Sequence, residues 1–144
     1  MGEFALMTSP HVHLVWPVAA LLGEGPVWLP QEAALRFVDI KSGKLHRFVP
    51  ETGACETLEV SGLPSFILPE VGGGLIIGLG DKLHRLESGH LGQVVAQVTM
   101  PAHNRTNDAT VDAAGRIWFG TMDDEEQVPS GRLYCLDSAG LHDM

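Results

Sequence analysis

The stretch Lys44-Leu45-His46-Arg47-Phe48 decides the fold, because it returns further along the chain as Lys82-Leu83-His84-Arg85-Leu86. A looser copy follows at Arg132-Leu133-Tyr134-Cys135-Leu136, after a longer gap that holds the acidic segment 123–130. Self-similarity at a period of about 40 to 50 residues is typical of repeat architectures. The chain is therefore expected to contain three copies of one structural unit.

Each copy lies third in a set of four short runs rich in apolar residues. The other runs are residues 26–28, 35–40 and 56–60 in the first set, 65–68, 75–79 and 94–98 in the second, and 109–111, 117–119 and 141–144 in the third. Glycines and prolines separate the runs, and no stretch sustains a helical period. Units of four antiparallel strands are typical of β-propeller blades. We predict an all-β chain with blades at about residues 23–62, 63–100 and 105–144.

A single sandwich of many hairpins is the alternative fold. The regular recurrence of four runs argues against it, and so does the absence of the Cys-Trp-Cys pattern of immunoglobulin-type sandwiches. Three blades do not close a ring, because propellers have about four to eight. We therefore expect either half of a larger propeller or a unit that pairs with an equivalent partner chain.

Composition and charge restrict the partners. The chain has 144 residues, of which 44% are hydrophobic, which is enough for one domain to bury a core. Its 18 acidic residues outnumber its 9 basic residues and give a net charge of −9. This balance argues against nucleic acid or an anionic membrane as a partner and suits a cation or a neutral polar ligand. No apolar run approaches the roughly 20 residues that cross a bilayer.

The N-terminus and the cysteines indicate where the domain begins and in which compartment the protein is expected. Glu3-Phe4 matches what a common cloning site encodes, and the first residues lack the pattern of a signal peptide. We interpret residues 1–10 as a cloning-derived or disordered leader and residues 11–144 as the domain. Cys55 and Cys135 show no Cys-x-x-Cys spacing, so we expect unpaired thiols in a reducing compartment and a cytoplasmic location.

The stretch from Asn104 to Met122 contains the most concentrated polar chemistry. Arg105, Asn107 and Asp108 bring a guanidinium, an amide and a carboxylate together just before a turn and an apolar strand. We expect a polar loop beside a tight hairpin, which is a common place for a binding site on a rigid sheet.

Several segments, taken in order, resemble the first half of the senescence-marker-protein, gluconolactonase and regucalcin family. They are Leu22-Gly23-Glu24-Gly25-Pro26-Val27-Trp28, Phe37-Val38-Asp39-Ile40, Arg105-Thr106-Asn107-Asp108, Val111-Asp112-Ala113-Ala114-Gly115-Arg116 and Gly120-Thr121-Met122. The resemblance runs from about His11 to Met144 and implies blades one to three of a six-bladed propeller of roughly twice this length. Ala109 departs from the pattern, because the family usually has glycine there.

The resemblance implies a metal-dependent lactonase that hydrolyses sugar lactones. Glu24 matches the first metal ligand of the family, Arg105 and Asn107 match substrate-binding positions, and Glu125 falls near a further substrate contact. Asp108 is expected to give structural support. The implied cofactor is a divalent metal, with calcium first and zinc, manganese or magnesium as alternatives. From local sequence alone, Glu24 could equally be a solvated turn carboxylate.

The family's other two metal ligands, an asparagine and an aspartate that doubles as the proposed general base, come from blades four and five. This chain has neither blade, so no catalytic residue is assigned and the isolated chain is expected to be inactive. Two hypotheses stay open. In the first, the chain is the catalytic half of a lactonase and is complete only with a second polypeptide or with a missing C-terminal half. In the second, it is a non-catalytic half-propeller that pairs with itself as a homodimer.

Overall fold

The computed structural model describes residues 11–144 and is all-β over that range. The interpretation of residues 1–10 as a leader lies outside the described residues. The first sheet contains β1 (Gly23–Leu29), β2 (Ala34–Asp39), β3 (Lys44–Val49) and β4 (Ala54–Glu59), with a 3-10 turn, η1 (Pro30–Glu32), between β1 and β2. The second contains β5 (Pro64–Pro69), β6 (Leu75–Leu79), β7 (Lys82–Glu87) and β8 (His90–Gln97). The third contains β9 (Asn104–Val111), β10 (Ile117–Asp123), β11 (Leu133–Asp137) and β12 (Gly140–Asp143).

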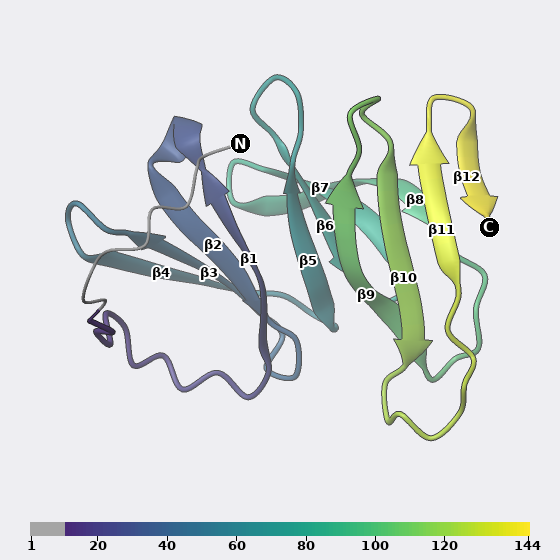
Figure 1. The fold of residues 1–144 in the computed structure, drawn as a ribbon, viewed down its shortest axis with the longest axis horizontal. Helices are drawn as coiled ribbons and strands as arrows, with labels where there is room; N and C mark the ends of the chain where they lie inside the picture. The colour runs from purple at the N-terminus through teal and green to yellow at the C-terminus, as the bar shows by residue number, and fades with distance from the viewer. Residues whose placement is uncertain (1–10) are drawn as a thin grey trace.

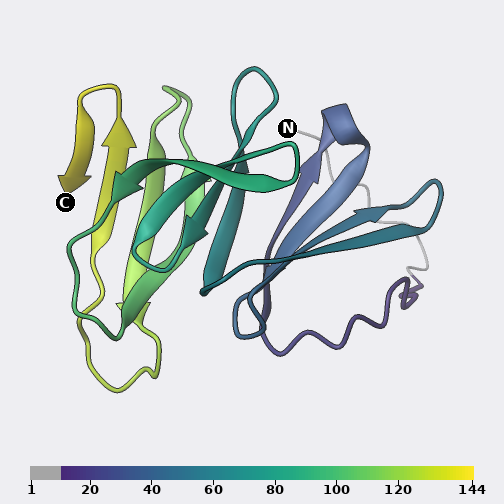
Figure 2. The same ribbon diagram turned by 180° about the vertical axis from the view of Figure 1, so that it is seen from behind.

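Within each sheet the strands pair in sequence order and antiparallel, so each sheet is one blade. The first strands of the blades, β1, β5 and β9, lie side by side and run in the same direction, with β5 in the middle (Figure 1). Figure 2 shows from behind how the later strands of each blade fan away from this inner row. This is the arc of a β-propeller, and the prediction of three four-stranded antiparallel units is confirmed. The sandwich alternative is wrong.

The core consists of two layers, one between each pair of neighbouring blades. Between the first and second blades, Val38 and Leu45 pack with Ile67 and Ile77. The layer between the second and third blades is built around Phe66, Leu83, Phe119 and Tyr134. Successive side chains of a strand point to opposite faces, so β5 sends Phe66 to one layer and Ile67 to the other. The middle blade is therefore buried on both faces.

The arginine of the repeat has the same structural task in the first two blades. Arg47 Nε donates to Oε2 of Glu32 at 2.8 Å, and Arg85 Nη2 donates to Oε1 of Glu70 at 2.6 Å. Each carboxylate lies in the connection between the first and second strands, and each arginine lies on the third. The ion pair therefore ties the third strand to the connection between the first two strands and gives the arginine of the repeated pattern the same role in both blades.

The third blade replaces this ion pair by other donors. Cys135 occupies the position opposite Trp118 that Arg85 occupies opposite Ile76, and its thiol cannot serve as a cation. The carboxylate in the corresponding connection is Asp112, which accepts from Trp118 Nε1 at 2.8 Å and from Arg116 Nε at 2.6 Å. The indole N–H, followed by the neighbouring backbone and Arg116 donors, holds the pKa of Asp112 well below its usual range.

The expected polar loop before residue 109 is wrong, because strand β9 begins at Asn104. Asn104, Arg105 and Thr106 are all buried, and a buried polar backbone needs the hydrogen bonds of a sheet. Thr106 N donates to Gly80 O at 2.8 Å, which joins the strand to the second blade. The polar residues therefore stand on a rigid inner strand. Among residues 11–144 the structure contains no helix long and apolar enough to cross a membrane.

Candidate functional site

Residues from all three blades meet at one end of the inner row of strands. Glu24, Ser65 and Arg105 are each the second residue of their strand, in β1, β5 and β9. These strands run the same way, so the three positions lie toward the same end, at the lower edge of Figure 1. The loop between β10 and β11 and the turn between β2 and β3 are at this edge too. We treat this end as the candidate site.

Glu24 is an exposed carboxylate on the first strand of the arc. The register of β1 against β2 shifts between Glu24 and Val27, and Gly25 has a φ of 57°, a left-handed conformation that glycine adopts without strain. No hydrogen bond or ion pair engages the Glu24 carboxylate within the described part of the chain. Its oxygens are therefore available to solvent or to a ligand.

Arg105 and Asn107 are brought together on β9. Arg105 is only 3% exposed, and its Nη1 donates to Oδ1 of Asn107 and to the carbonyl oxygen of Thr106, both at 3.1 Å. Asn107 is half-buried, and its amide nitrogen has no hydrogen-bond partner within residues 11–144. This nitrogen is a donor free for a ligand.

A buried guanidinium needs a counter-charge, and Asp124 supplies it. Arg105 Nε donates to Oδ1 of Asp124 at 2.7 Å. The same oxygen accepts from Nζ of Lys41 at 2.7 Å, across from the first blade. The ammonium of Lys41, and after it the guanidinium of Arg105, hold the pKa of the Asp124 carboxyl below its usual range despite partial burial. Neither Lys41 nor Asp124 was predicted from the sequence as a site residue.

The loop that carries Asp124 and Glu125 is organised by the residue before them. Asp123 is 4% exposed, and its carboxylate accepts from the backbone N–H groups of Gln127 at 2.8 Å and Val128 at 2.9 Å. Burial opposes its ionisation, but these backbone donors outweigh burial and lower the pKa of Asp123. The Asp123 carboxylate therefore fixes the shape of the loop through hydrogen bonds from the loop backbone.

The structure does not place the other two expected residues in the Arg105 cluster. The carboxylate of Glu125 is exposed on the loop, next to Asp124, and no hydrogen bond links it to Arg105 or Asn107. Asp108 is exposed, and its Oδ1 accepts from the adjacent Ala109 N at 2.8 Å. This bond supports the strand just beyond Asn107.

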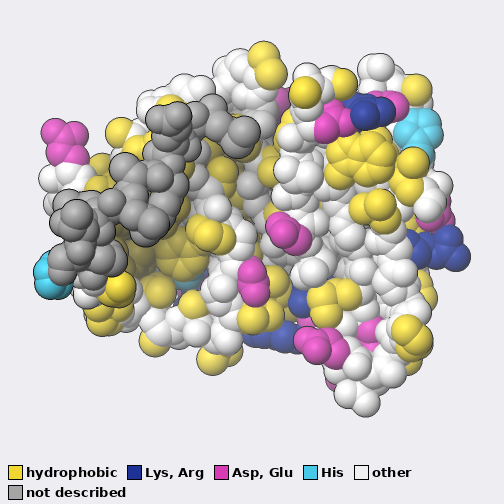
Figure 3. Space-filling view, viewed as in Figure 1, with side chains coloured by type: hydrophobic (Ala, Val, Ile, Leu, Met, Phe, Trp, Pro, Cys, Tyr) yellow, Lys and Arg dark blue, Asp and Glu magenta, His cyan; other side chains and the backbone are white. Residues whose placement is uncertain are grey.

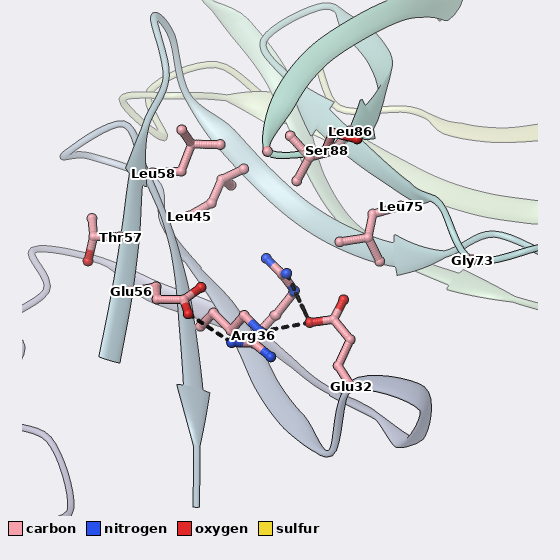
Figure 4. A pocket seen from close by; sticks show the side chains of 12 residues that line it. Glu32, Arg36, Leu45, Glu56, Thr57, Leu58, Gly73, Leu75, Leu86 and Ser88 are labelled. Carbon is pink, nitrogen blue, oxygen red and sulfur yellow. Dashed lines mark hydrogen bonds and ion pairs between the residues drawn. The ribbon is translucent and has the colours of Figure 1, made fainter. Parts of the chain in front are cut away.

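A separate cavity lies in the groove between the first and second blades (Figure 4). It has a volume of about 380 Å³ and is lined by Arg36, Arg47, Glu32 and Glu56 together with leucines of both blades. Glu32 binds both arginines and Glu56 binds Arg47, so its charges are already paired. None of the candidate site residues lines it. The groove is therefore a structural feature of the blade junction.

Charged side chains of both signs lie on and around the face that the inner strands form. Figure 3 shows single acidic side chains on the face formed by the inner strands and basic side chains near its lower edge, with further basic side chains at the upper right and at the right-hand edge of the view. Among residues 11–144 there is no group of three histidine, cysteine, aspartate or glutamate side chains that could hold a metal ion. Within residues 11–144, this end of the arc offers the unpaired carboxylates of Glu24 and Glu125, the fixed guanidinium of Arg105 and the free amide donor of Asn107.

Three blades around one inner row of strands define the arc of a β-propeller, with its candidate ligand site at one end of that row. The model of the SMP-30/gluconolactonase/LRE-like region matches residues 22–143, which is most of the chain. The chain belongs to this family, and the resemblance noted from its motifs is confirmed.

Relatives with curated names agree with this assignment. A pentonolactonase from Haloferax volcanii is 39% identical over 120 residues, covering 83% of this chain and 40% of the relative. A 6-deoxy-6-sulfogluconolactonase from Pseudomonas putida is 38% identical over 122 residues, covering 83% of this chain and 42% of the relative. Regucalcin from Gallus gallus is 36% identical, covering 83% of this chain and 40% of the relative. The chain thus spans less than half the length of these relatives.

Solved structures show the same fold. A regucalcin from Agrobacterium tumefaciens, described as a calcium-binding protein, superposes with a TM-score of 0.83 at 22% identity, over 90% of this chain and 44% of that one. A gluconolactonase from Xanthomonas campestris superposes with a TM-score of 0.71 at 21% identity, over 87% of this chain and 48% of that one.

Proposed function

We propose that this chain forms three blades of a hydrolase that acts on sugar lactones, with Arg105 and Asn107 in its substrate site. The observation that carries the proposal is the 3.1 Å contact between these two side chains on a buried inner strand, within a family match over residues 22–143. The names of the lactonase relatives supply the reaction class.

A sugar lactone presents ring hydroxyls and an ester carbonyl, which are recognised by donors and acceptors in fixed positions. In this proposal the free amide nitrogen of Asn107 and the remaining N–H groups of Arg105 donate to the lactone oxygens. The Glu125 carboxylate, on the loop beside Asp124, accepts from a hydroxyl. Asp108 supports the strand through its bond to Ala109 N.

A divalent cation is proposed as a further component of the complete site, with Glu24 as one ligand. When bound, such an ion polarises an ester carbonyl and lowers the pKa of a bound water. Carboxylate oxygen suits calcium first, which the Agrobacterium tumefaciens regucalcin is described as binding, and magnesium, manganese or zinc are alternatives. Glu24 alone does not make a metal site, since the described residues contain no group of three such ligands. We therefore assign substrate binding to this chain and no chemical step.

The isolated chain is proposed to be inactive and to work with a missing C-terminal half or with a second copy of itself, in the cytoplasm. Exposed apolar side chains at the two ends of the arc support self-association. Val27 and Tyr134 face the second blade, so Trp28 and Leu133, each 50% exposed, face away from it on the two flanks. The same observation favours the second candidate function, a non-catalytic half-propeller that self-associates. Static light scattering on the purified chain is expected to show a dimer, and a monodisperse monomer would contradict self-association.

Calorimetry with D-gluconolactam, a hydrolysis-resistant analogue of the lactone, tests the substrate site. We expect weak binding by the chain, at least about tenfold weaker in Asn107→Ala, because a donor to the ligand is removed. Gln31→Ala, which removes an exposed amide outside the candidate site, is the control and should bind as the wild type does. Equal binding by Asn107→Ala would contradict the assignment, and absence of binding by the wild type would favour the non-catalytic module. With calcium, magnesium, manganese or zinc added, a pH-stat should detect no hydrolysis of D-glucono-1,5-lactone above the spontaneous rate.

A further inference from the structure

The guanidinium of Arg105 is held from two blades at once. Its Nε donates to Oδ1 of Asp124 at 2.7 Å, and the same oxygen accepts from Lys41 Nζ at 2.7 Å. Lys41 Nζ also donates to the carbonyl oxygen of Asp124 at 3.2 Å. Lys41 belongs to the turn between β2 and β3 of the first blade, whereas Arg105 and Asp124 belong to the third. The contact thus connects two blades that are not neighbours in the arc.

Burial distinguishes this arrangement from an ordinary surface ion pair. The side chain of Arg105 is 3% exposed and that of Asp124 is 24% exposed, so their attraction is only partly screened by water. The side chain of Lys41 is 38% exposed, and a pair so exposed contributes little stability of its own. Lys41 matters because it holds the carboxylate oxygen to which Arg105 is bound.

The contacts leave one edge of the guanidinium for a ligand. Nε is bound to Asp124, and Nη1 is bound to Thr106 O and to Oδ1 of Asn107. Nη2 has no hydrogen-bond partner within residues 11–144. Because the guanidinium is planar and rigid, fixing Nε and Nη1 also fixes the direction of Nη2.

We propose that Asp124 and Lys41 are positioning residues of the ligand site. Asp124 fixes the plane of the Arg105 guanidinium so that Nη2 is presented to the ligand, and Lys41 anchors Asp124 from the first blade. The orientation of the substrate-binding arginine then depends on the position of the blade that carries Glu24. The inference rests on the proposed function only in taking a sugar lactone as the ligand.

Exchange of the arginine side-chain N–H with water, followed by NMR on the full 144-residue chain, tests the positioning directly. The Nε–H signal of Arg105 is assigned by its loss in Arg105→Lys. We expect its exchange to be at least about tenfold faster in Asp124→Asn, because the accepting charge is lost, and to be faster by a smaller factor in Lys41→Met. Lys41→Arg, which keeps the charge and the donor, should restore slow exchange. Lys44→Met removes a lysine of the same blade that forms no ion pair in the described residues, and should leave the signal unchanged.

The same variants are then titrated with D-gluconolactam. The dissociation constant should rise about tenfold in Asp124→Asn and should rise in Lys41→Met without a change in melting temperature. Unchanged exchange at Arg105 in both variants would overturn the positioning proposal, regardless of the dissociation constant of the lactam. Faster exchange in both variants, with no lactam binding by the wild type, would support the positioning of Arg105 and overturn the proposed function instead.

Discussion

Ser65 Oγ lies 2.7 Å from Thr106 Oγ1, and both residues are buried between the second and third blades. Thr106 stands between Arg105 and Asn107 on β9, and its backbone N–H is bound to Gly80 O. Strand β9, which carries Arg105 and Asn107, is therefore bound to the second blade through Thr106. Blade packing and the geometry of the site are coupled through this hydroxyl pair.

Replacing one partner of this pair should destabilise the fold. Ser65→Ala leaves the Thr106 hydroxyl buried without its partner, so we expect the free energy of unfolding to fall by about 1 to 3 kcal/mol. Chemical denaturation measures the change, with the exposed Ser61→Ala as a control that should be neutral. The double variant Ser65→Ala/Thr106→Val should lose less than the sum of the two single variants. Strict additivity would contradict a direct bond between the two hydroxyls.

His46 should make stability depend on pH. The ring is 2% exposed, its Nδ1 is bound to Thr57 Oγ1 at 2.9 Å, and its Nε2 has no partner among the described residues. Trp16 and Phe37 pack against it, with ring centroids at 5.1 and 4.8 Å. Burial lowers the pKa of His46, an effect that the nearby charge of Asp39 opposes and that of Lys44 reinforces.

The direction in which stability changes with pH follows from this lowered pKa of His46. The unfolded histidine, with its ordinary pKa of about 6.5, takes up a proton before the folded one does. The stability from the neutral buried ring is therefore present above about pH 6.5 and is lost as pH falls through that value toward the lowered folded pKa. Urea unfolding at a series of pH values should show a shallower decline for His46→Gln than for the wild type. The exposed His90→Gln should follow the wild type, and equal slopes in all three chains would contradict the account.

The carboxylate of Glu24 should bind a divalent cation only weakly in this chain. A single carboxylate completed by water is a poor calcium site, so calorimetry is expected to show a dissociation constant of about a millimolar or weaker. Glu24→Gln should abolish this binding, while Glu51→Gln, at an exposed position outside the candidate site, should leave it unchanged. Micromolar calcium affinity that depends on Glu24 would show that further ligands reach the ion.

The repeat predicted the fold well. Strands that bury one or both faces are rich in apolar residues, so the spacing of the apolar runs gives the positions of the strands. The sequence did not explain why the arginine recurs. That required the contacts of Arg47 with Glu32 and of Arg85 with Glu70, which join residues far apart in the chain. The prediction of a loop before residue 109 was wrong. It assumed that polar side chains are exposed, but a polar side chain can be buried when it has hydrogen-bonding partners. Thr106 and Arg105 both have such partners.

The candidate site was predictable only in part. Arg105 and Asn107 are close in sequence and close in space, so their contact could be expected from the motif. Asp124 lies beyond a whole hairpin from Arg105, and Lys41 lies two blades earlier, so no local pattern could pair them. A turn lysine and a loop aspartate on a strongly acidic chain look like ordinary surface charges. Only the curvature of the arc brings them together.

Mapping the lactam site by NMR tests the central claim most directly. In a titration of the nitrogen-labelled chain with D-gluconolactam, we predict that the largest shifts fall on the Nε–H of Arg105 and the side-chain amide of Asn107. The paired arginines of the groove between the first and second blades, Arg36 and Arg47, should show little change. Shifts confined to Arg36 and Arg47, with Arg105 and Asn107 unmoved, would contradict the assignment of the substrate site to the inner strands.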